Sequence, residues 1–208
     1  ATITAGLPSS EGKLGSMAPS FHQQRERERC AALASLEGQS PRELSNEQQI
    51  DRLALRSRLL RECEDFVRGR HTMEPNAPEQ LLGVLFHELR RGQDHPKRAA
   101  NNLRSLLKAA PDFLNEAAQV LVRPERVWLQ VMEQTISGAE ALLEGVAEFL
   151  AGVTLKESDR QAIGRTRKAL HRYGDHAFSL RPASAGSFAI GTTSRQRRVR
   201  DELGLDYS

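Results

Sequence analysis

The chain has 208 residues, of which 38% are hydrophobic, 27% charged and 5% aromatic, and its formal net charge is +3. This length suits one large domain, or one domain with a small lobe, and the scarcity of aromatics requires a core of Leu, Val, Ala and Ile. The absence of a run of about 18 apolar residues argues against a membrane span. No segment resembles a signal peptide, which favours a cytoplasmic protein, but a chain that begins at Ala1 leaves a secreted or periplasmic location open.

Residues 1–19 are rich in Gly, Ser, Pro and Thr, and we interpret them as a flexible leader before a helical domain over 20–208. A highly charged first helix is expected from Pro19 to about Leu36. Ser45 opens a second helix that ends near Gly69, because S-N-E-Q forms a capping box. Apolar residues recur along it at helical spacing: Ile50, Leu53, Leu55, Leu59, Leu60, Cys63 and Phe66.

Prolines mark the next helix starts, since proline fits the first turn, where no N–H is missed. A third helix follows Asn76, and a fourth runs from Pro96 to about Ala110. Pro111 is expected to start a fifth helix and Pro124 a sixth. The sixth helix is long, ending near residue 151, and we expect it to bury Trp128 and Leu142, which lie on one face.

A second capping box, Ser158 to Gln161, predicts a seventh helix that ends near Phe178. A last helix is expected after Thr192 or Thr193, ending at 203 with a glycine at 204. No segment alternates with period two for long. The sequence therefore predicts an all-α fold with seven to eight helices in antiparallel hairpins and no substantial sheet.

The histidines do not form a metal-binding motif. A zinc peptidase helix needs two histidines four residues apart, but the fourth residue after His87 is Arg91. His171 and His176 are five apart, roughly 140° around a helix, which is a poor chelate even with Asp175. Cys30 and Cys63 have no partner at chelating spacing and are expected to be reduced thiols. We therefore expect no metal, no cofactor and no catalytic residue in this chain.

Phosphate-binding glycine loops and nucleophile-elbow motifs are also absent. Four arginines cluster near the end of the chain: Arg195, Arg197, Arg198 and Arg200. They lack interleaved aromatic residues, and acidic residues follow at 201 and 202, which disfavours nucleic-acid binding. A solvated face, or one that binds an anionic substrate, is the preferred interpretation.

Four segments occur in an order that is typical of one family. They are D-R-L-x-L-R-x-x-L at Asp51–Leu59, an arginine-containing helix into P-x-x-L at Arg98–Leu114, P-x-x-V at Pro124–Val127, and F-x-x-G at Phe188–Gly191 continuing to VRDELGL. Over about residues 25–208 the chain resembles the bacterial domain of unknown function 885 family, whose full-length members are similar to gluzincin zinc peptidases.

The resemblance implies that this chain is the helical N-terminal portion of a zinc-metallopeptidase-like hydrolase and walls its substrate channel. The zinc-binding HExxPGH helix of the family lies beyond the position equivalent to Ser208, so zinc is expected in the full-length relative only. Peptide-like substrates would pass near Phe188, Gly191 and Arg195. Whether this chain has an enzymatic activity of its own is left open.

Two other functions stay open. One is a helical interaction or scaffold protein without catalysis, and the other, less favoured, is a basic helical nucleic-acid binder. The expected partner is the missing catalytic half or a second copy of the chain, with no nucleic acid and no membrane. Either partner would cover apolar residues late in the chain: Phe178, Phe188, Ile190, Leu203, Leu205 and Tyr207.

Overall fold

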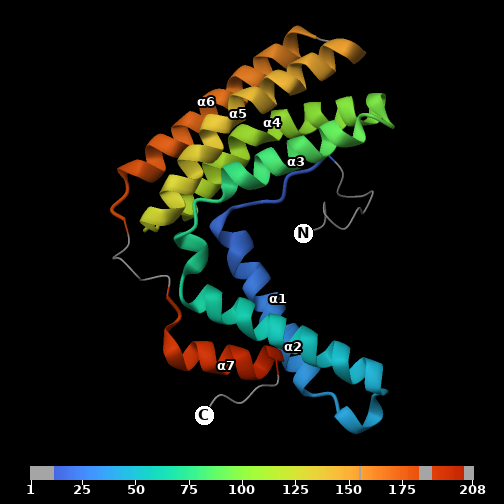
Figure 1. Cartoon of the computed structure of the whole chain (residues 1–208), viewed down its shortest axis with the longest axis vertical. Coiled ribbons are helices and arrows are strands. Elements are labelled where there is room, and N and C mark those ends of the chain that lie inside the picture. Colours follow the sequence, from blue (N-terminus) through green and yellow to red (C-terminus); the bar gives the residue numbers. More distant parts are fainter. Residues whose placement is uncertain (1–11, 155, 183–188, 204–208) are drawn as a thin grey trace.

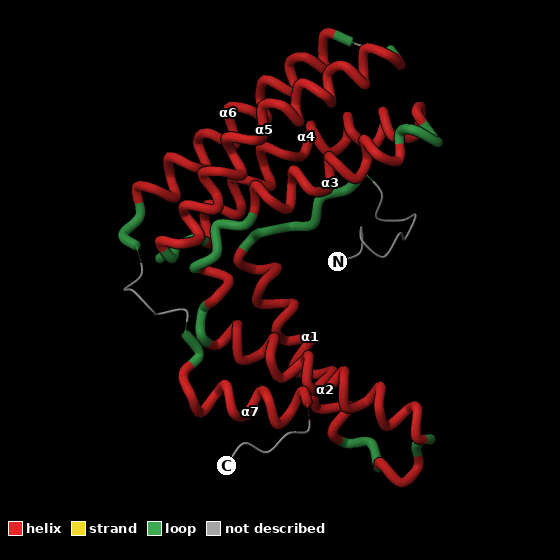
Figure 2. Tube along the Cα trace, viewed as in Figure 1, coloured by secondary structure: helices red, strands yellow, loops and turns green. Residues whose placement is uncertain are grey.

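The computed structural model of the chain describes residues 12–154, 156–182 and 189–203. Within these ranges it has seven α-helices, two short 3-10 helices and no strand (Figures 1 and 2), which confirms the expected all-α fold. The α-helices are α1 (Pro19–Glu37), α2 (Asn46–Val67), α3 (Ala77–Arg91), α4 (Pro96–Val120), α5 (Arg126–Val153), α6 (Glu157–Ser179) and α7 (Gly191–Leu203).

Helices α3 to α6 form a four-helix bundle made of two antiparallel hairpins, α3–α4 and α5–α6 (Figure 1). The hairpins pack together so that α3 lies on α5 and α4 lies on α6. Leucine dominates the interior, as the low aromatic content requires. The completely buried leucines include Leu81, Leu85, Leu103, Leu106, Leu107, Leu143 and Leu150.

Pro111 lies inside α4 rather than at the start of a helix, so the expected break after Ala110 is wrong. Proline has no N–H to donate to the carbonyl four residues earlier, which is that of Leu107. The hydroxyl of the buried Thr166, on α6, donates to this carbonyl at 3.3 Å. Helix α6 thus supplies the hydrogen bond that α4 cannot make, and α4 runs for 25 residues.

The two expected capping boxes have different outcomes. The first is confirmed: Ser45 and Gln48 exchange hydrogen bonds, with N–H to Oγ at 3.3 Å and N–H to Oε1 at 2.9 Å. The second, on Ser158, is wrong, because the N-cap of α6 is Lys156, two residues earlier, so Ser158 lies within the first turn. There the carboxylate of Asp159 accepts from the backbone N–H of Lys156 at 3.0 Å, so Asp159 closes the first turn.

Helices α1, α2 and α7 form a second layer beside the bundle (Figure 1). The link between α2 and α3 fixes this layer to the bundle. In it, the carbonyls of Thr72 and Met73 accept from the N–H groups of Val122 and Glu125 at 2.9 and 3.2 Å. The connection before α3 is therefore held against the connection between α4 and α5.

Residues 12–18, the second half of the segment that we interpreted as a leader, run along α4. The hydroxyl of Ser16 and the N–H of Met17 both donate to Glu116 Oε2 at 2.8 Å. Leu14 and Met17 are partly buried against the core. This part of the chain belongs to the helical fold, and Glu116 anchors it.

The long helix α5 buries a different face from the expected one. Trp128 and Leu142 are only half-buried, and Trp128 lines a shallow hollow of about 220 Å³. Leu143, Val146 and Leu150 are completely buried instead. The core of the bundle is thus centred on Leu143, and Leu142 packs against it from the edge.

We expect Leu143→Ala to lower the free energy of unfolding by about 2–5 kcal/mol, because it leaves a cavity in the closed core. Leu142→Ala is the matched control and should cost clearly less, since Leu142 is already partly solvated. Denaturant unfolding of the two variants measures the difference. Equal losses would mean that α5 is rotated from the orientation described.

Thr166→Val should cost about 1–3 kcal/mol, because it leaves the buried Leu107 carbonyl without a donor. In a Pro111→Ala background the same substitution should cost much less, since the restored backbone N–H can donate to that carbonyl. A double-mutant cycle measured by denaturant unfolding tests this coupling. Additive effects would show that the hydroxyl does not compensate for Pro111.

Candidate functional site

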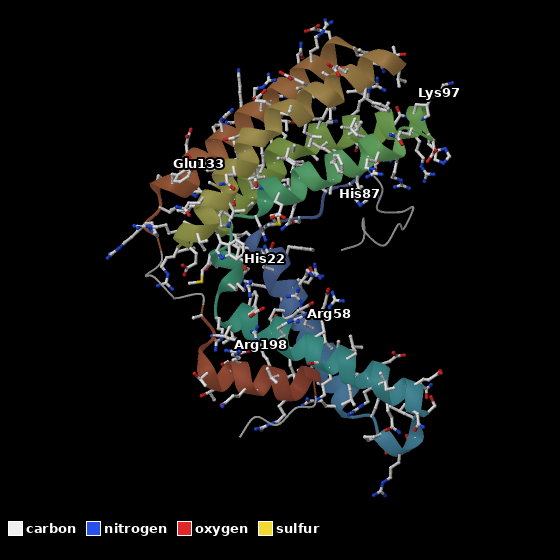
Figure 3. All side chains as sticks on the ribbon, viewed as in Figure 1. His22, Arg58, His87, Lys97, Glu133 and Arg198 are labelled. Carbon is white, nitrogen blue, oxygen red and sulfur yellow. The ribbon has the colours of Figure 1, made fainter. Side chains whose placement is uncertain are left out.

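A groove of about 750 Å³ lies between α2 and α7. Among the described residues its lining includes one carboxylate, Glu64, and six arginines: Arg56, Arg61, Arg68, Arg197, Arg198 and Arg200. Three of the arginines come from α2 or its C-terminal cap and three from α7, so the packing of the two helices brings them together. Figure 3 labels Arg198 where α7 faces α2.

Glu64 lies at the centre of this arginine groove and attaches α7 to α2. Its Oε1 is 2.7 Å from Arg197 NH2 and 3.3 Å from Arg68 NH2, and its Oε2 is 2.9 Å from Arg198 Nε. Arg198 also contacts Asp65 at 2.6 Å. Side chains 191–200 of α7 include none that is completely buried, so charge pairs rather than apolar packing hold the helix.

The electrostatics of the groove favour ionised carboxylates. Burial opposes the ionisation of Glu64, but hydrogen bonds from Arg198 and Ser194, with the charges of Arg198 and Arg197, outweigh it and lower its pKa. Arg68 reaches across to α7 as well, donating to Ser194 Oγ at 2.6 Å. A carboxylate in this groove is therefore stabilised in its charged form.

Two of the substrate-channel residues predicted from the sequence, Gly191 and Arg195, are on α7, but Arg195 does not line the groove. Gly191 is the first residue of α7, and its φ of +75° gives the left-handed turn into the helix that favours glycine. Thr192 and Thr193 lie within α7, so neither caps it. Arg195 is exposed on α7 but does not line the groove. Phe188 lies outside the described residues, as does the glycine expected to follow α7.

The histidines examined as possible zinc ligands lie apart. His87 is exposed on α3 (Figure 3). His171 is 3.9 Å from a carboxylate oxygen of Glu140, whereas His176 Nε2 is 3.0 Å from the carbonyl of Ala118. In the described part of the chain none of them belongs to a group with metal-binding geometry.

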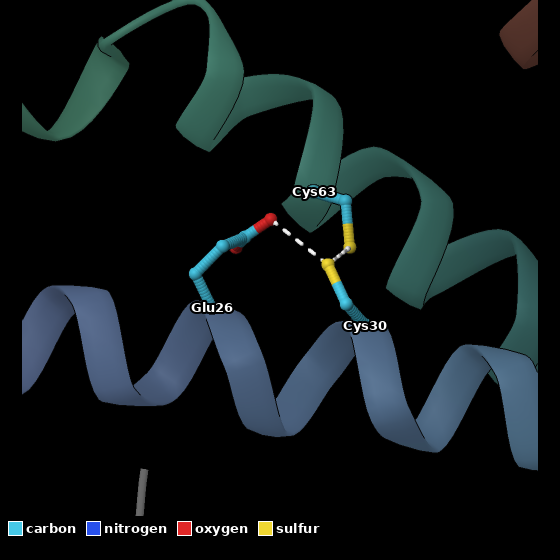
Figure 4. A group of neighbouring side chains, drawn as sticks. All are labelled: Glu26, Cys30 and Cys63. Atoms are coloured by element: carbon cyan, nitrogen blue, oxygen red, sulfur yellow. Dashed lines mark hydrogen bonds between the residues drawn. The ribbon is translucent and has the colours of Figure 1, made fainter.

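One cluster was missed by the sequence analysis. Glu26, Cys30 and Cys63 meet between α1 and α2 (Figure 4), although the cysteines are 33 residues apart. The spacing of residues along one helix does not show which residues of another helix they will contact. The only signal available was the pair of Glu26 and Cys30, which four residues of helix place on one face.

No protein-family model matches the chain, and no curated protein or solved structure matches it either. The family resemblance stays a prediction from the motifs. None of the helices, as far as the structure describes them, combines the length and the apolar character needed to cross a bilayer.

A stack of rings joins α1 to the end of α2. The His22 and His71 rings are 5.3 Å apart between centroids, and Phe66 stacks on His71 at 4.4 Å. Burial, followed by the charges of Arg25 and Arg29, lowers the pKa of His22. Burial, followed by the charge of His22, lowers the pKa of His71.

Because both histidines have a lower pKa when folded, the unfolded chain binds more protons, and stability should fall as the pH drops below about 6.5. His71→Phe keeps a ring on Phe66 and should reduce this loss between about pH 7.5 and 5.5, above the range where carboxylates titrate. His87→Gln, an exposed control, should not. Denaturant unfolding across this range measures it, and an unchanged pH dependence in His71→Phe would contradict the assignment.

Proposed function

We propose that this chain is the non-catalytic helical portion of a zinc-metallopeptidase-like hydrolase, and that the groove between α2 and α7 walls the path of acidic peptide substrates. The observation that carries the proposal is the charge of the lining, six arginines to one carboxylate among the described residues. Guanidinium groups bind carboxylates through paired hydrogen bonds and give up their hydration more readily than ammonium groups.

The arginines of the groove have two roles in this proposal. Arg68, Arg197 and Arg198 hold Glu64 and thereby keep α7 on α2. Arg61 and Arg200 line the same groove with exposed side chains, one from each helix. A peptide lying along the groove would bring its carboxylates between these two residues, where the surrounding positive charge stabilises them.

Exposed apolar side chains support the idea that another polypeptide covers this layer. On α2, Ile50, Leu53 and Val67 are 67%, 57% and 83% exposed, although helical spacing had predicted a buried face for the first two. Phe178, at the end of α6, is 50% exposed. In the proposal the catalytic half covers these residues, because burial of their exposed apolar side chains would favour its association.

The same exposure also favours the second candidate, a helical scaffold without catalysis, in which a partner protein or a second copy covers α2. The two candidates differ in one observable. A reading frame that encodes an HExxH helix after Ser208 would favour the hydrolase. A reading frame without such a helix would favour the scaffold.

We expect the chain to bind a short glutamate-rich peptide, measured by calorimetry, and not its glutamine counterpart. Arg61→Gln and Arg200→Gln should each weaken binding about tenfold or more, because a hydrogen bond between charged groups contributes about 1.5–3 kcal/mol. Arg195→Gln is the matched control, since Arg195 is exposed on α7 but outside the lining. Added salt should weaken binding through charge screening.

Equal affinity for the two peptides, or equal effects of the three variants, would overturn the role of the groove. Binding of a polynucleotide with a steep salt dependence, lost in the Arg61 and Arg200 variants, would favour the nucleic-acid alternative instead. If a zinc-binding half is encoded downstream, the joined protein should hydrolyse acidic peptides, and the groove variants should raise KM with little change in kcat.

A further inference from the structure

The seam between α1 and α2 carries a second cluster with its own chemistry. Cys30 Sγ lies 3.8 Å from Cys63 Sγ and 3.5 Å from Glu26 Oε1 (Figure 4). One ligand atom from each of the three residues lies within 4.8 Å of the other two. Two sulfur atoms and one carboxylate oxygen thus converge on one point.

These distances match those between ligands of a single tetrahedral zinc ion. With Zn–S bonds of about 2.3 Å and Zn–O bonds of about 2.0 Å, two thiolates on one zinc lie about 3.8 Å apart, and a thiolate and a carboxylate oxygen about 3.5 Å apart. Thiolates are soft ligands that select zinc over the hard cations Mg²⁺ and Ca²⁺. Two of the three separations between ligand atoms are thus those that the metal requires, and the third lies within 4.8 Å.

A buried carboxylate oxygen provides an independent observation. Glu26 Oε2 is buried and makes no hydrogen bond, while Arg29 NH1 is 3.8 Å away and Arg29 Nε contacts Glu62 at 2.7 Å. Leaving a buried carboxylate oxygen without a partner costs free energy. Glu26 Oε1 is the oxygen that faces Cys30, so a cation held by both oxygens of this carboxylate would compensate for the cost at Oε2. The positive charge of Arg29 would balance the excess negative charge of the ligands.

We propose that Glu26, Cys30 and Cys63 form a zinc site that joins α1 to α2 and leaves a fourth position for water or an anionic ligand. Cys63 also lines the arginine groove, which gives the metal a route of access. The inference does not rest on the proposed function, whose zinc belongs to another part of the protein. It reverses the expectation from local spacing, which considered only ligands close together in the sequence.

Without a cation, the surroundings of Cys63 oppose the ionisation of its thiol. Burial, then the hydrogen bond with Cys30 and the negative charge of Glu26, raises the pKa of Cys63 to about 12. Zinc is bound by thiolates rather than thiols, so zinc binding releases thiol protons and its affinity should rise with pH. Proton release on zinc addition is a readout that non-specific surface binding would not share.

The test uses the whole chain, reduced with a phosphine and free of oxygen, and titrated with Co²⁺ as a spectroscopic substitute for zinc. We expect one cobalt per chain, thiolate-to-cobalt charge-transfer absorption, tetrahedral d–d bands, and displacement of cobalt by Zn²⁺. Cys30→Ser and Cys63→Ser should each abolish the two-thiolate spectrum. Glu26→Gln should keep the charge-transfer absorption while weakening cobalt binding about tenfold or more.

His87→Gln is the control and should leave the cobalt spectrum unchanged, since His87 lies on α3. Far-ultraviolet circular dichroism of each variant separates a lost ligand from a lost fold, and the Glu26→Gln variant tests the site where a cysteine variant unfolds. Absence of thiolate-to-cobalt absorption in the reduced chain would overturn the proposal. So would stoichiometric zinc that persists in the Cys30→Ser, Cys63→Ser double variant.

Discussion

A single hydrogen bond, from Thr166 to the carbonyl of Leu107, lets α4 continue past Pro111. The continuity of α4 matters because this helix contacts the other three helices of the bundle and also holds residues 12–18. A helix that ended before Pro111 would displace the segment in which the carbonyl of Ala118 lies 3.0 Å from Nε2 of His176 on α6. It would also move Glu116, and with it the start of α1, away from the bundle. The fold therefore depends on a hydrogen bond that Pro111 cannot make within α4 and that Thr166 of α6 makes instead.

The two layers of the molecule are stabilised by different forces. In the bundle, leucines from all four helices are completely removed from water, so the hydrophobic effect dominates. Between α2 and α7 the contacts are guanidinium–carboxylate pairs around Glu64, and between α1 and α2 they include Arg29 with Glu62. Partly exposed charge pairs contribute little each and weaken with salt. The groove is thus built in the layer whose packing is easier to rearrange.

Local patterns in the sequence were enough to predict most of the helices but not the contacts between them. The capping box at Ser45 and the helix start at Pro19 depend on neighbouring residues only, and both are present. Pro111 was misinterpreted because the donor that compensates for it, Thr166, comes from another helix, 55 positions later in the sequence. Helical spacing located an apolar side of α2 but could not show that no described helix covers Ile50 and Leu53.

The same limit applies to the chemistry. Arginines 197, 198 and 200 are recognisable as a cluster from the sequence, yet Arg61 and Arg68 join them only through the packing of α7 on α2. Cys30 and Cys63 are likewise ordinary until α1 crosses α2. Sites made of residues on one helix can be read from their spacing, whereas sites made between helices require the packing to be known.

Glu64 bears on the selectivity of the acidic-peptide binding that we propose for the groove. Its carboxylate already occupies the guanidinium groups of Arg68, Arg197 and Arg198, so the protein carries an internal surrogate for an acidic ligand. An incoming molecule with one carboxylate gains little, because it exchanges one ion pair for another. A chain with several carboxylates can exchange several ion pairs at the same time, and the linkage between its groups raises its effective concentration at the groove. Under the proposed function, the groove would thus distinguish ligands by the number of their carboxylates.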